Sequence, residues 1–358
     1  MPGTKLLVSG RSGADVRVQL SAAHEGWISA KDIVFLPGVP APRAVTGAIG
    51  ATATATGSIV RIALSEKVPF QVEEAEDLGG LTVRFFYTDG HSNWIVYDAN
   101  DGFIDSVRWR QESAGVVAVT IRLAQGQTLW GWQPSFDGGG LKLELRRPPA
   151  LSPAPASVFR KVKILLDPGH MPSAPGSVGP MGTKEMDANY AIARAVEKLL
   201  LREGALPTLT RGTTDHEVSL VDRPRQAVDQ SVDLFVSLHN NALPDGENPF
   251  AKPRGFSVFY YHPHSLALGR AVYRSYQKRV PLPGEELRYG DLLVARLSAV
   301  PAILVESAYM IVPSQEERLN DPSFRSTLAK AVVEGLRHFL ENERQRQQKI
   351  SRAKKESR

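Results

Sequence analysis

The stretch ILLDPGH, residues 164–170, predicts a buried strand that stops at an ionisable side chain, His170. The run before the stop is continuously apolar, which is typical of a strand covered on both faces. Two later apolar runs stop in the same way, and these are residues 232–238 before His239 and residues 302–305 before Glu306. Amphipathic helical patterns alternate with the runs, for example over residues 186–202. This alternation predicts a three-layer α/β domain over residues 158–342.

The sequence divides near residue 150 into halves of different pattern. Residues 147–157 hold four prolines, which exclude a helix interior or a central strand and predict a semi-rigid linker. Before this linker, residues 58–147 alternate apolar and polar side chains between glycine-containing turns, which predicts a β-sandwich. Short alternating runs in residues 1–37 predict a further, small all-β module. Residues 37–58, built from Pro, Gly, Ala and Thr, have no apolar face and predict a second linker.

Composition excludes several classes of protein. The chain has 358 residues, of which 42% are hydrophobic and 23% are charged, so it is globular rather than collagenous, disordered or coiled-coil. It lacks cysteine, which excludes disulfides, thiolate metal sites and thiol nucleophiles. No uncharged stretch reaches the roughly 18 apolar residues that a membrane span needs. The net charge of +5 equals that of residues 343–358 alone, so we expect a solvated helical tail there and no nucleic-acid partner.

Four ionisable groups form the candidate site. His170, His239 and Glu306 each follow a predicted strand, and open α/β sheets bind ligands beyond the carboxyl ends of their strands. Glu185 opens the first helix of the domain. Two imidazoles and one carboxylate suit Zn²⁺ with an open position for water, and Glu306 would remain free to move protons. The spacings of 15 and 54 residues match no short metal motif, and each residue also has a structural interpretation as a strand end or a helix N-terminus.

Five phrases carry a family resemblance, and in chain order they are ILLDPGH (164–170), GSVGPMGTKEMDANYAIA (176–193), LTRGTTDHEVSLVDRPRQA (209–227), DLFVSLHNNA (233–242) and VPAILVESAYM (300–310). Over residues 162–342 the chain resembles the zinc-dependent N-acetylmuramoyl-L-alanine amidases that split daughter-cell walls. The resemblance implies a mainly parallel sheet and Zn²⁺ held by His170, Glu185 and His239, with Glu306 as the catalytic carboxylate. It also implies cleavage of the amide bond between N-acetylmuramic acid and L-alanine in peptidoglycan.

Segments at the rim of the predicted cleft depart from the family pattern. Residues 171–175 stand where the family has a glycine-rich stretch with an acidic residue, and residues 307–314 differ from the usual continuation after the catalytic glutamate. Neither segment includes a predicted ligand, so the departures concern substrate preference rather than the metal. Residues 240–254 have no helical period, which predicts that no plug helix blocks the site.

Several neighbours are weaker candidates. Asn240 and Asn241 follow a ligand and either orient it or contact substrate, although turn residues need no function. Arg296 precedes the last strand and is either a clamp for a stem-peptide carboxylate or a structural ion pair. We expect Asp167 to support a ligand histidine or its loop from the second layer of contacts.

The first half carries two looser resemblances. Residues 16–20 and 25–33 resemble the last strands of a bacterial SH3-like domain, and residues 58–74 resemble the N-terminal β-domain that precedes many envelope amidases. Because an SH3-like domain would begin well before Met1, we expect an upstream segment with a signal peptide. Action in the cell envelope, in the periplasm or outside the cell, follows from that expectation. Peptidoglycan is the expected partner, and a protein activator is not identified by any pattern.

Two other functions stay open. The altered rim segments allow a non-catalytic peptidoglycan-binding protein that keeps the amidase fold. A zinc peptidase of the carboxypeptidase type shares a related α/β layout, but that class places its first two ligands in a short HxxE motif, and His170 is followed by Met171, Pro172 and Ser173. Zinc content, the activity of Glu306→Ala and the mass of the products separate the three functions.

Overall fold

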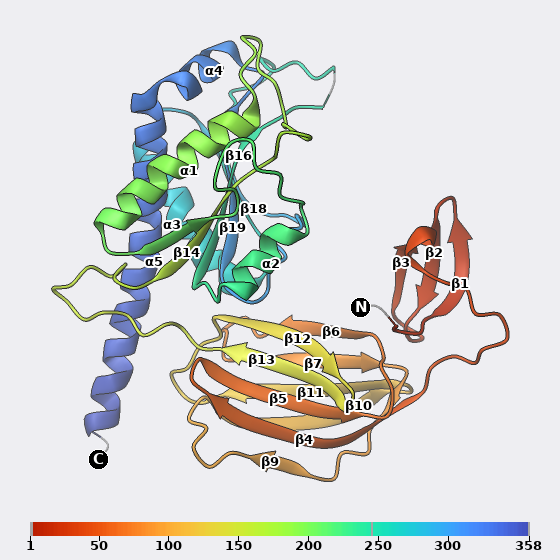
Figure 1. The fold of residues 1–358 in the computed structure, drawn as a ribbon. Coiled ribbons are helices and arrows are strands. Elements are labelled where there is room, and N and C mark those ends of the chain that lie inside the picture. The colour runs from red at the N-terminus through yellow and green to blue at the C-terminus, as the bar shows by residue number, and fades with distance from the viewer. Residues whose placement is uncertain (1–2, 245, 357–358) are drawn as a thin grey trace. The chain divides into compact units, whose positions relative to one another are not determined.

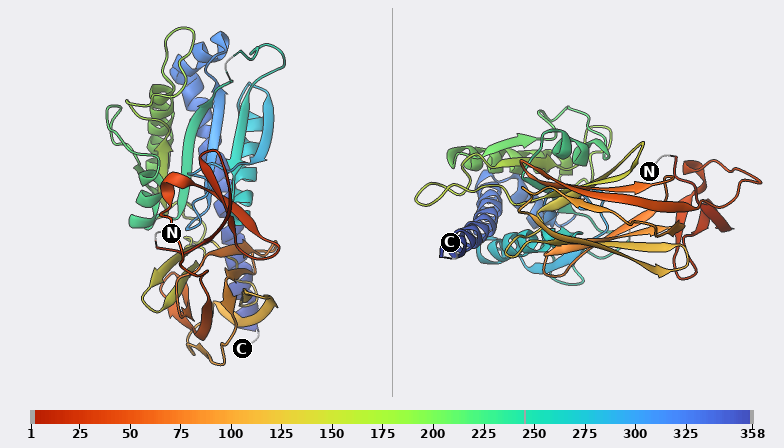
Figure 2. Two further views of the ribbon diagram at one scale, coloured as in Figure 1. Left: turned by 90° about the vertical axis from the view of Figure 1, so that its right-hand side faces the viewer. Right: turned by 90° about the horizontal axis from the view of Figure 1, so that it is seen from below.

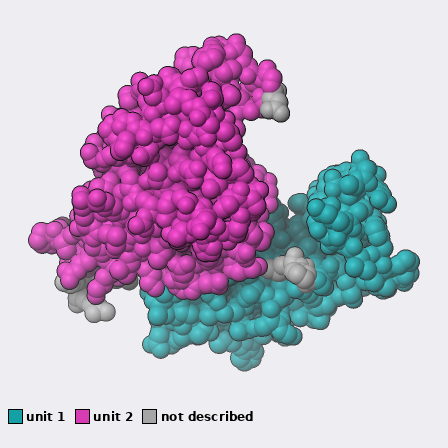
Figure 3. Space-filling model, turned by 45° about the horizontal axis from the view of Figure 1, so that its top comes forward, with its two compact units in different colours: residues 1–147 teal, residues 148–358 magenta. Residues whose placement is uncertain are grey.

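The computed structural model describes residues 3–244 and 246–356. The chain divides into two compact units, Met1–Arg147 and Pro148–Arg358 (Figure 1, Figure 3). The first unit is built from strands, and the second combines strands with helices.

A three-stranded antiparallel sheet begins the first unit. Its elements are β1 (Leu7–Ser12), β2 (Asp15–Gln19), β3 (Glu25–Ser29) and the short 3₁₀ helix η1 (Ala30–Asp32). Val16 and Val18 of β2 are buried, whereas Trp27 of β3 is more than half exposed. The strands agree with the short alternating runs of the sequence, and the likeness to an SH3-like domain stays a prediction.

Two β-sheets form the rest of the first unit. One has the strand order β10-β11-β7-β6, and the other has the order β12-β13-β5-β4-β8 with β9 paired to β4. The strands are β4 (Ala44–Thr54), β5 (Gly57–Leu64), β6 (Phe70–Glu74), β7 (Gly80–Phe86), β8 (Thr88–Asp89), β9 (Ile95–Tyr97), β10 (Ile104–Ser113), β11 (Val116–Leu123), β12 (Gly131–Asp137) and β13 (Gly140–Arg146). Apolar side chains of both sheets, such as Val83 and Leu143, share one buried core. This packing is that of a β-sandwich.

The second linker predicted for residues 37–58 is wrong over most of its length. Ala44–Thr54 form the strand β4, which pairs with β5, so the β-sandwich begins at Ala44. The buried side chains of β4 include one large apolar residue, Ile49, beside small ones such as Ala51. Alanine, glycine and threonine produce little apolar alternation, and the neighbouring strands supply the burial that makes this segment a strand.

The second unit contains a six-stranded sheet of order β15-β14-β16-β19-β17-β18. The strands are β14 (Lys163–Pro168), β15 (Leu206–Leu209), β16 (Leu234–Asn241), β17 (Phe256–Tyr260), β18 (Gly284–Tyr289) and β19 (Ala302–Tyr309). All neighbouring pairs are parallel except β17 and β19. The mainly parallel sheet is therefore confirmed, and its central strands are buried apolar runs, as expected for strands covered on both faces.

Helices cover both faces of this sheet. They are α1 (Glu185–Arg202), α2 (Asp222–Asp229), α3 (Pro263–Arg279), α4 (Pro313–Asn320) and α5 (Pro322–Glu356). Helices α1, α3 and α5 pack together on one face, and α2 lies on the other (Figure 1). Ala227 of α2 and Leu165 of β14 belong to the buried cluster on that second face. These layers confirm the predicted three-layer α/β fold. Among the described residues, no helix is long and apolar enough to cross a membrane.

Helix α5 includes the basic residues near the C-terminal end. The sequence predicts a solvated helical tail over residues 343–358, and α5 does continue unbroken to Glu356 (Figure 1, Figure 2), although Glu343 is buried rather than solvated. Gln347 donates to the carbonyl of Pro149 at 3.0 Å and accepts from the N–H of Leu151 at 3.4 Å. The first part of the expected tail therefore anchors the proline-rich linker.

Candidate metal centre and active site

Three strands bring the predicted site residues to one edge of the sheet. Strands β14, β16 and β19 are parallel neighbours, so their carboxyl ends lie together. In this ladder Asp167 pairs with Ser237, and His239 pairs with Glu306. His170 follows β14 with a φ of 67°, in the left-handed region that residues other than glycine seldom adopt. This uncommon backbone conformation presents the imidazole of His170 to that of His239.

Both histidines and Glu185 converge on one point. Glu185 is the first residue of α1, and its Oε1 lies 3.0 Å from Nε2 of His170 and 3.1 Å from Nδ1 of His239. The two imidazole rings meet edge to face with their centroids 4.8 Å apart. One ligand atom from each of the three residues lies within 4.8 Å of the others. Because zinc takes two imidazoles and a carboxylate as ligands in catalytic sites, this donor set fits the metal.

The carboxylate of Glu185 is buried and held in place by backbone donors. Its Oε2 accepts from the N–H of Ser177 at 3.0 Å, and its Oε1 accepts from the N–H of Asn240 at 3.2 Å. Burial raises the pKa of Glu185, but hydrogen bonds with His170 and His239 outweigh burial and hold the pKa well below its usual range. The carboxylate is therefore ionised, and the N-terminus of α1 favours its negative charge.

Two glycines allow the ligands to approach so closely. A Cβ on Gly176 would lie 2.5 Å from Oε2 of Glu185 and 2.6 Å from the ring of His170, and the φ of Gly176 is 75°. A Cβ on Gly169 would collide with the ring of His239. Any side chain at these positions would displace a predicted ligand.

Glu306 is a second buried carboxyl group, and its surroundings shift its pKa in the opposite direction from that of Glu185. Its Oε2 is buried and has no hydrogen-bond partner among the described residues. Burial raises the pKa of Glu306 well above its usual value, and the negative charge of Glu185 raises it further. Two neighbouring carboxyl groups whose pKa values are driven apart are typical of acid–base sites.

Asp167 supports the turn that carries His170. It is fully buried, and its Oδ1 accepts from the hydroxyl of Thr210 and the guanidinium of Arg223, each at 2.6 Å. Its Oδ2 accepts from the hydroxyl of Ser237 at 2.7 Å. Arg223 also donates to the carbonyl of His170 at 2.6 Å. Asp167 thus acts on His170 through Arg223 and not by direct contact.

One protein family matches the part of the chain that contains these residues. The family described as N-acetylmuramoyl-L-alanine amidase matches residues 164–338, which contain all three predicted ligands and Glu306. The match covers slightly less than half of the chain, so residues 164–338 are similar to this amidase family.

Curated relatives and solved structures of amidases cover about the same half of the chain. The probable cell wall amidase LytH of Staphylococcus epidermidis is 32% identical over 179 residues, which are 49% of this chain and 58% of that protein. LytH of Staphylococcus aureus matches to the same extent. The chain thus spans 58% of the length of these relatives. Amidase AmiC2 of Nostoc punctiforme aligns with a TM-score of 0.46 and 28% identity, over 50% of this chain and 97% of its own. An amidase of Clostridium difficile 630 aligns with a TM-score of 0.47 and 26% identity, over 51% and 98%.

Two asparagines complete the polar network around Glu185. Asn189 lies one turn after Glu185 on α1, and its amide donates to Oε1 of Glu185 at 3.2 Å and to the carbonyl of Gly169 at 3.3 Å. Asn240 donates its side-chain amide to Asn189 at 2.8 Å. The sequence analysis includes Asn240 but misses Asn189, although a spacing of four residues places Asn189 on the same helix face as Glu185.

The other two weak candidates lie outside this network. Asn241 donates its side-chain amide to the carbonyl of Gly255 at 3.1 Å and so closes the loop after β16. Arg296 precedes β19 at the opposite edge of the sheet, where it forms an exposed ion pair with Asp291. A substrate clamp at Arg296 is not supported, because β19 separates this side chain from Glu306. The structural alternative, an ion pair, is what the structure contains.

A further carboxylate, Glu316 of α4, holds the loop that leads into Glu185. It is fully buried and accepts from the N–H groups of Met181 at 2.8 Å and Thr183 at 2.9 Å. A Cβ on Gly179 would collide with this carboxylate. Burial alone would raise the pKa of Glu316, but the two backbone donors lower it below its usual value. The sequence analysis misses Glu316, because nothing in the polar sequence of α4 distinguishes it.

Proposed function

We propose that this chain is a zinc-dependent amidase that hydrolyses the amide bond between N-acetylmuramic acid and L-alanine in peptidoglycan. One observation carries the proposal: the metal-binding atoms of His170, Glu185 and His239 converge, and His239 pairs across neighbouring strands with Glu306, whose buried Oε2 has no hydrogen-bond partner among the described residues. The match of residues 164–338 to the amidase family supports the same reaction.

The three ligand residues would hold the zinc ion through Nε2 of His170, the carboxylate of Glu185 and Nδ1 of His239. When bound, zinc supplies a Lewis acid that polarises an amide carbonyl and lowers the pKa of water. Ser177 and Asn240 fix Glu185 through their backbone N–H groups, so this ligand is oriented before the ion binds.

Glu306 is the group that moves protons in this proposal. Its Oε2 has no competing partner among the described residues, so it can take a proton from the attacking water and pass it to the nitrogen of L-alanine as that amine leaves. The raised pKa of Glu306 makes its protonated form more accessible, as donation to the leaving group requires.

We further propose that the protein acts in the cell envelope on peptidoglycan, with residues 158–342 as the catalytic domain. The names of the relatives, probable cell wall amidases, support this place of action. In the same proposal the β-sandwich binds an envelope polymer and the three-stranded sheet at the N-terminus is part of an SH3-like domain. Both modules would then hold the catalytic domain near its substrate.

Digestion of purified peptidoglycan tests the reaction. We expect about one zinc ion per chain by elemental analysis. We also expect stem peptides with a free N-terminal L-alanine, detected by mass spectrometry. Loss of a C-terminal amino acid would instead indicate a carboxypeptidase, and binding without any release would indicate a non-catalytic wall protein.

Two histidine variants make the metal assignment specific. His170→Ala removes a predicted ligand and should abolish both zinc binding and peptide release. His216→Ala alters an exposed loop histidine and should retain both. Equal zinc content in the two variants would contradict the assignment of His170.

A further inference from the structure

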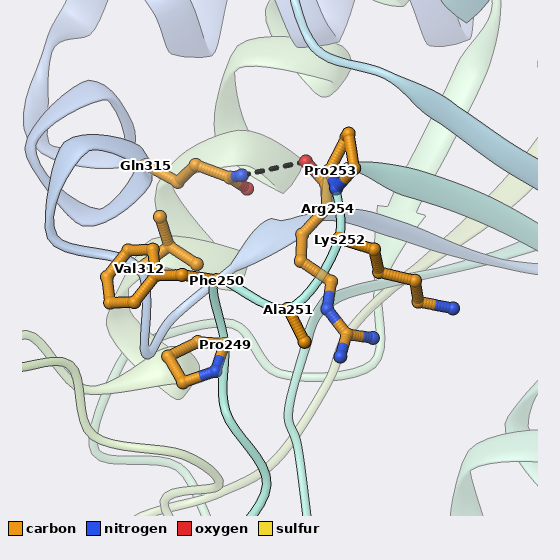
Figure 4. Close-up of a pocket in the computed structure, with 8 residues that line it drawn as sticks. All are labelled: Pro249, Phe250, Ala251, Lys252, Pro253, Arg254, Val312 and Gln315. Carbon is orange, nitrogen blue, oxygen red and sulfur yellow. Dashed lines mark hydrogen bonds between the residues drawn. The ribbon is translucent and has the colours of Figure 1, made fainter.

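A pocket of about 380 Å³ lies in the loop that follows β16 (Figure 4). Residues 249–254 form one part of its wall, and Val312 and Gln315, which follow β19, form the rest. Strands β16 and β19 carry His239 and Glu306 of the metal centre. The pocket therefore lies at the same edge of the sheet as the proposed catalytic residues.

The loop that contributes residues 249–254 to the pocket is irregular. Its described residues, 242–244 and 246–255, form no helix, in agreement with the absence of a helical period in the sequence. Figure 4 shows Arg254 on one side of the pocket, with Phe250 and Val312 on the other.

Two charged residues line this pocket, the exposed Lys252 and the more deeply buried Arg254. The side chain of Arg254 is 10% exposed, and its Nε is buried with no hydrogen-bond partner in the described part of the chain. The guanidinium lies over the ring of Tyr309, 5.5 Å from the centroid, and Gln315 donates to the backbone carbonyl of Arg254 at 2.9 Å (Figure 4). The ion pair with the exposed Glu247 spans 3.7 Å, which is too long for a hydrogen bond. The side chain is thus fixed in place with donor capacity to spare.

A planar anion is the ligand that such a guanidinium binds best. The rigid fork of N–H donors matches a carboxylate in two parallel hydrogen bonds. An unpartnered, buried N–H group is unfavourable, and a ligand carboxylate would relieve this cost.

Arg254 is within reach of a peptide bound at the metal centre. Tyr309, which the guanidinium covers, follows Glu306 by three residues on β19, about 10 Å of extended chain. Gly255, next to Arg254, accepts from Asn241 at the end of β16. In an extended peptide, a side-chain carboxylate of the second residue lies roughly 7–10 Å from the nitrogen of the first.

We propose that Arg254 binds a carboxylate of the stem-peptide residue that follows L-alanine, and that the pocket thereby selects acidic over amidated stem peptides. The inference rests on the proposed function, because it places the peptide side of the scissile amide at the loop after β16. The ligand replaces Glu247, whose exposed side chain is free to turn toward solvent. Arg254 would then have the clamping role that the sequence analysis gives to Arg296.

Binding of two muramoyl dipeptides tests this role. The zinc-loaded Glu306→Gln protein is titrated by calorimetry with N-acetylmuramoyl-L-alanyl-D-glutamate and with its diamide. We expect the acid to bind about tenfold more tightly or better, and Arg254→Gln in the same background to reduce its affinity to that of the diamide. Arg270→Gln, a change of an exposed arginine on α3, is the matched control and should leave both affinities within about twofold.

The outcomes separate a carboxylate site from a structural arginine. Equal binding of acid and diamide, no binding of either, or an equal loss of both in Arg254→Gln would overturn the inference. Arg254→Lys keeps the positive charge but lacks the planar guanidinium. Its affinity for the acid should lie between the affinities of the protein with Arg254 and of Arg254→Gln. If Arg254→Gln does not fold, Glu247→Gln leaves Arg254 in place and should tighten the acid by about two- to fivefold, and an unchanged affinity would overturn the inference.

The inference and the proposed function fail separately. A protein that discriminates the two dipeptides through Arg254 but releases no stem peptide from peptidoglycan has the carboxylate site without the amidase reaction. A protein that releases stem peptides with the same preference before and after Arg254→Gln has the reaction without this site.

Discussion

The two edges of the six-stranded sheet, formed by the carboxyl and the amino ends of β14, β16 and β19, differ in how deeply several of their charged side chains are buried. At the carboxyl edge of β14, β16 and β19, the carboxylates of Asp167, Glu185 and Glu316 are buried and hydrogen-bonded. At the opposite edge, where β19 begins, Arg296 and Asp291 form an ion pair in which both side chains are more than half exposed. Burying charge is costly unless each charge has its partners, whereas an exposed pair contributes little. Most of these buried carboxylates lie at the carboxyl edge, although Asp233, just before β16 at the opposite edge, is also buried and accepts from the N–H of Lys163 at 2.9 Å.

The largest expected effect is on turnover, at Glu306. Glu306→Gln keeps the size of the side chain but cannot transfer a proton, so kcat for stem-peptide release should fall about 10²–10⁴-fold. Zinc content should stay unchanged, because Glu306 is not among the converging ligands. Glu317→Gln, a change of an exposed glutamate on α4, is the control and should keep the full rate. A loss of zinc in Glu306→Gln would show that this residue is a ligand and would break the division of roles.

The next effect is on stability, at the buried ion pair between Arg223 and Asp167, close to the proposed metal ligand His170. Arg223→Ala leaves Asp167 charged, buried and without its cation, which should lower the free energy of unfolding by about 3–5 kcal/mol in urea titrations. Arg225→Ala, on the same helix, removes an exposed partner of Asp222 and should lower it by less than about 1 kcal/mol. Similar losses in the two variants would mean that burial does not separate the two kinds of ion pair.

Two glycine variants test whether the predicted ligands are packed too closely to admit a further side chain. Gly176 and Gly182 both have a left-handed φ, 75° and 88°, so an alanine at either position should cost about 1–3 kcal/mol of backbone strain. Only Gly176→Ala also pushes against Glu185 and His170, because the space around Gly182 is open. Zinc affinity, measured by competition with a chelator, should fall about 10–100-fold in Gly176→Ala and stay unchanged in Gly182→Ala. Equal affinities would contradict the close packing of the ligands.

Glu316 predicts a pH-dependent effect. Its pKa is lower in the folded protein than its ordinary value of 4.5, so it stabilises the fold when ionised. The stabilisation is complete above the ordinary pKa and is lost as the pH falls through the lower, folded value. Glu316→Gln should therefore reduce the free energy of unfolding by about 1–3 kcal/mol at pH 7, and the difference from the parent protein should shrink below about pH 4. A difference that is constant from pH 7 to pH 3 would show that the carboxylate charge is irrelevant.

The sequence could predict the part of the site that lies at the ends of apolar strands, but not the part that is held by distant contacts. His170, His239 and Glu306 could be predicted from the sequence, because each follows the end of an apolar run. Parallel strands bring their carboxyl ends to one edge of the sheet, so residues at these ends lie together. Arg254 and Glu316 could not be predicted, because their contacts join residues far apart in the chain: the side chain of Gln315 donates to the carbonyl of Arg254, and Glu316 accepts from the N–H of Met181. Such contacts leave no periodic pattern, and only the folded chain brings the atoms together.

In the fold, the missed elements are those whose side chains resemble loops. Strand β4 is made mostly of small residues, β18 is the charged segment GEELRY at the edge of its sheet, and α4 is a short polar helix. Burial by neighbours decides the structure of such segments, and a propensity argument does not include neighbours. Long apolar runs and the amphipathic helices were placed well because their own composition requires burial.

The smallest expected effect sharpens the comparison most. Arg296 is the clamp candidate from the sequence, and Arg254 is the clamp that we propose from the structure. Arg296→Ala breaks only an exposed ion pair and should change the free energy of unfolding by less than about 0.5 kcal/mol, with kcat/KM on peptidoglycan unaltered. Arg254→Ala, measured in the same assays, should raise KM for acidic stem peptides while kcat stays near its original value, because the guanidinium binds ground state and transition state alike. If the two variants behave in the same way, exposure at one edge and burial at the other do not determine which arginine meets the substrate.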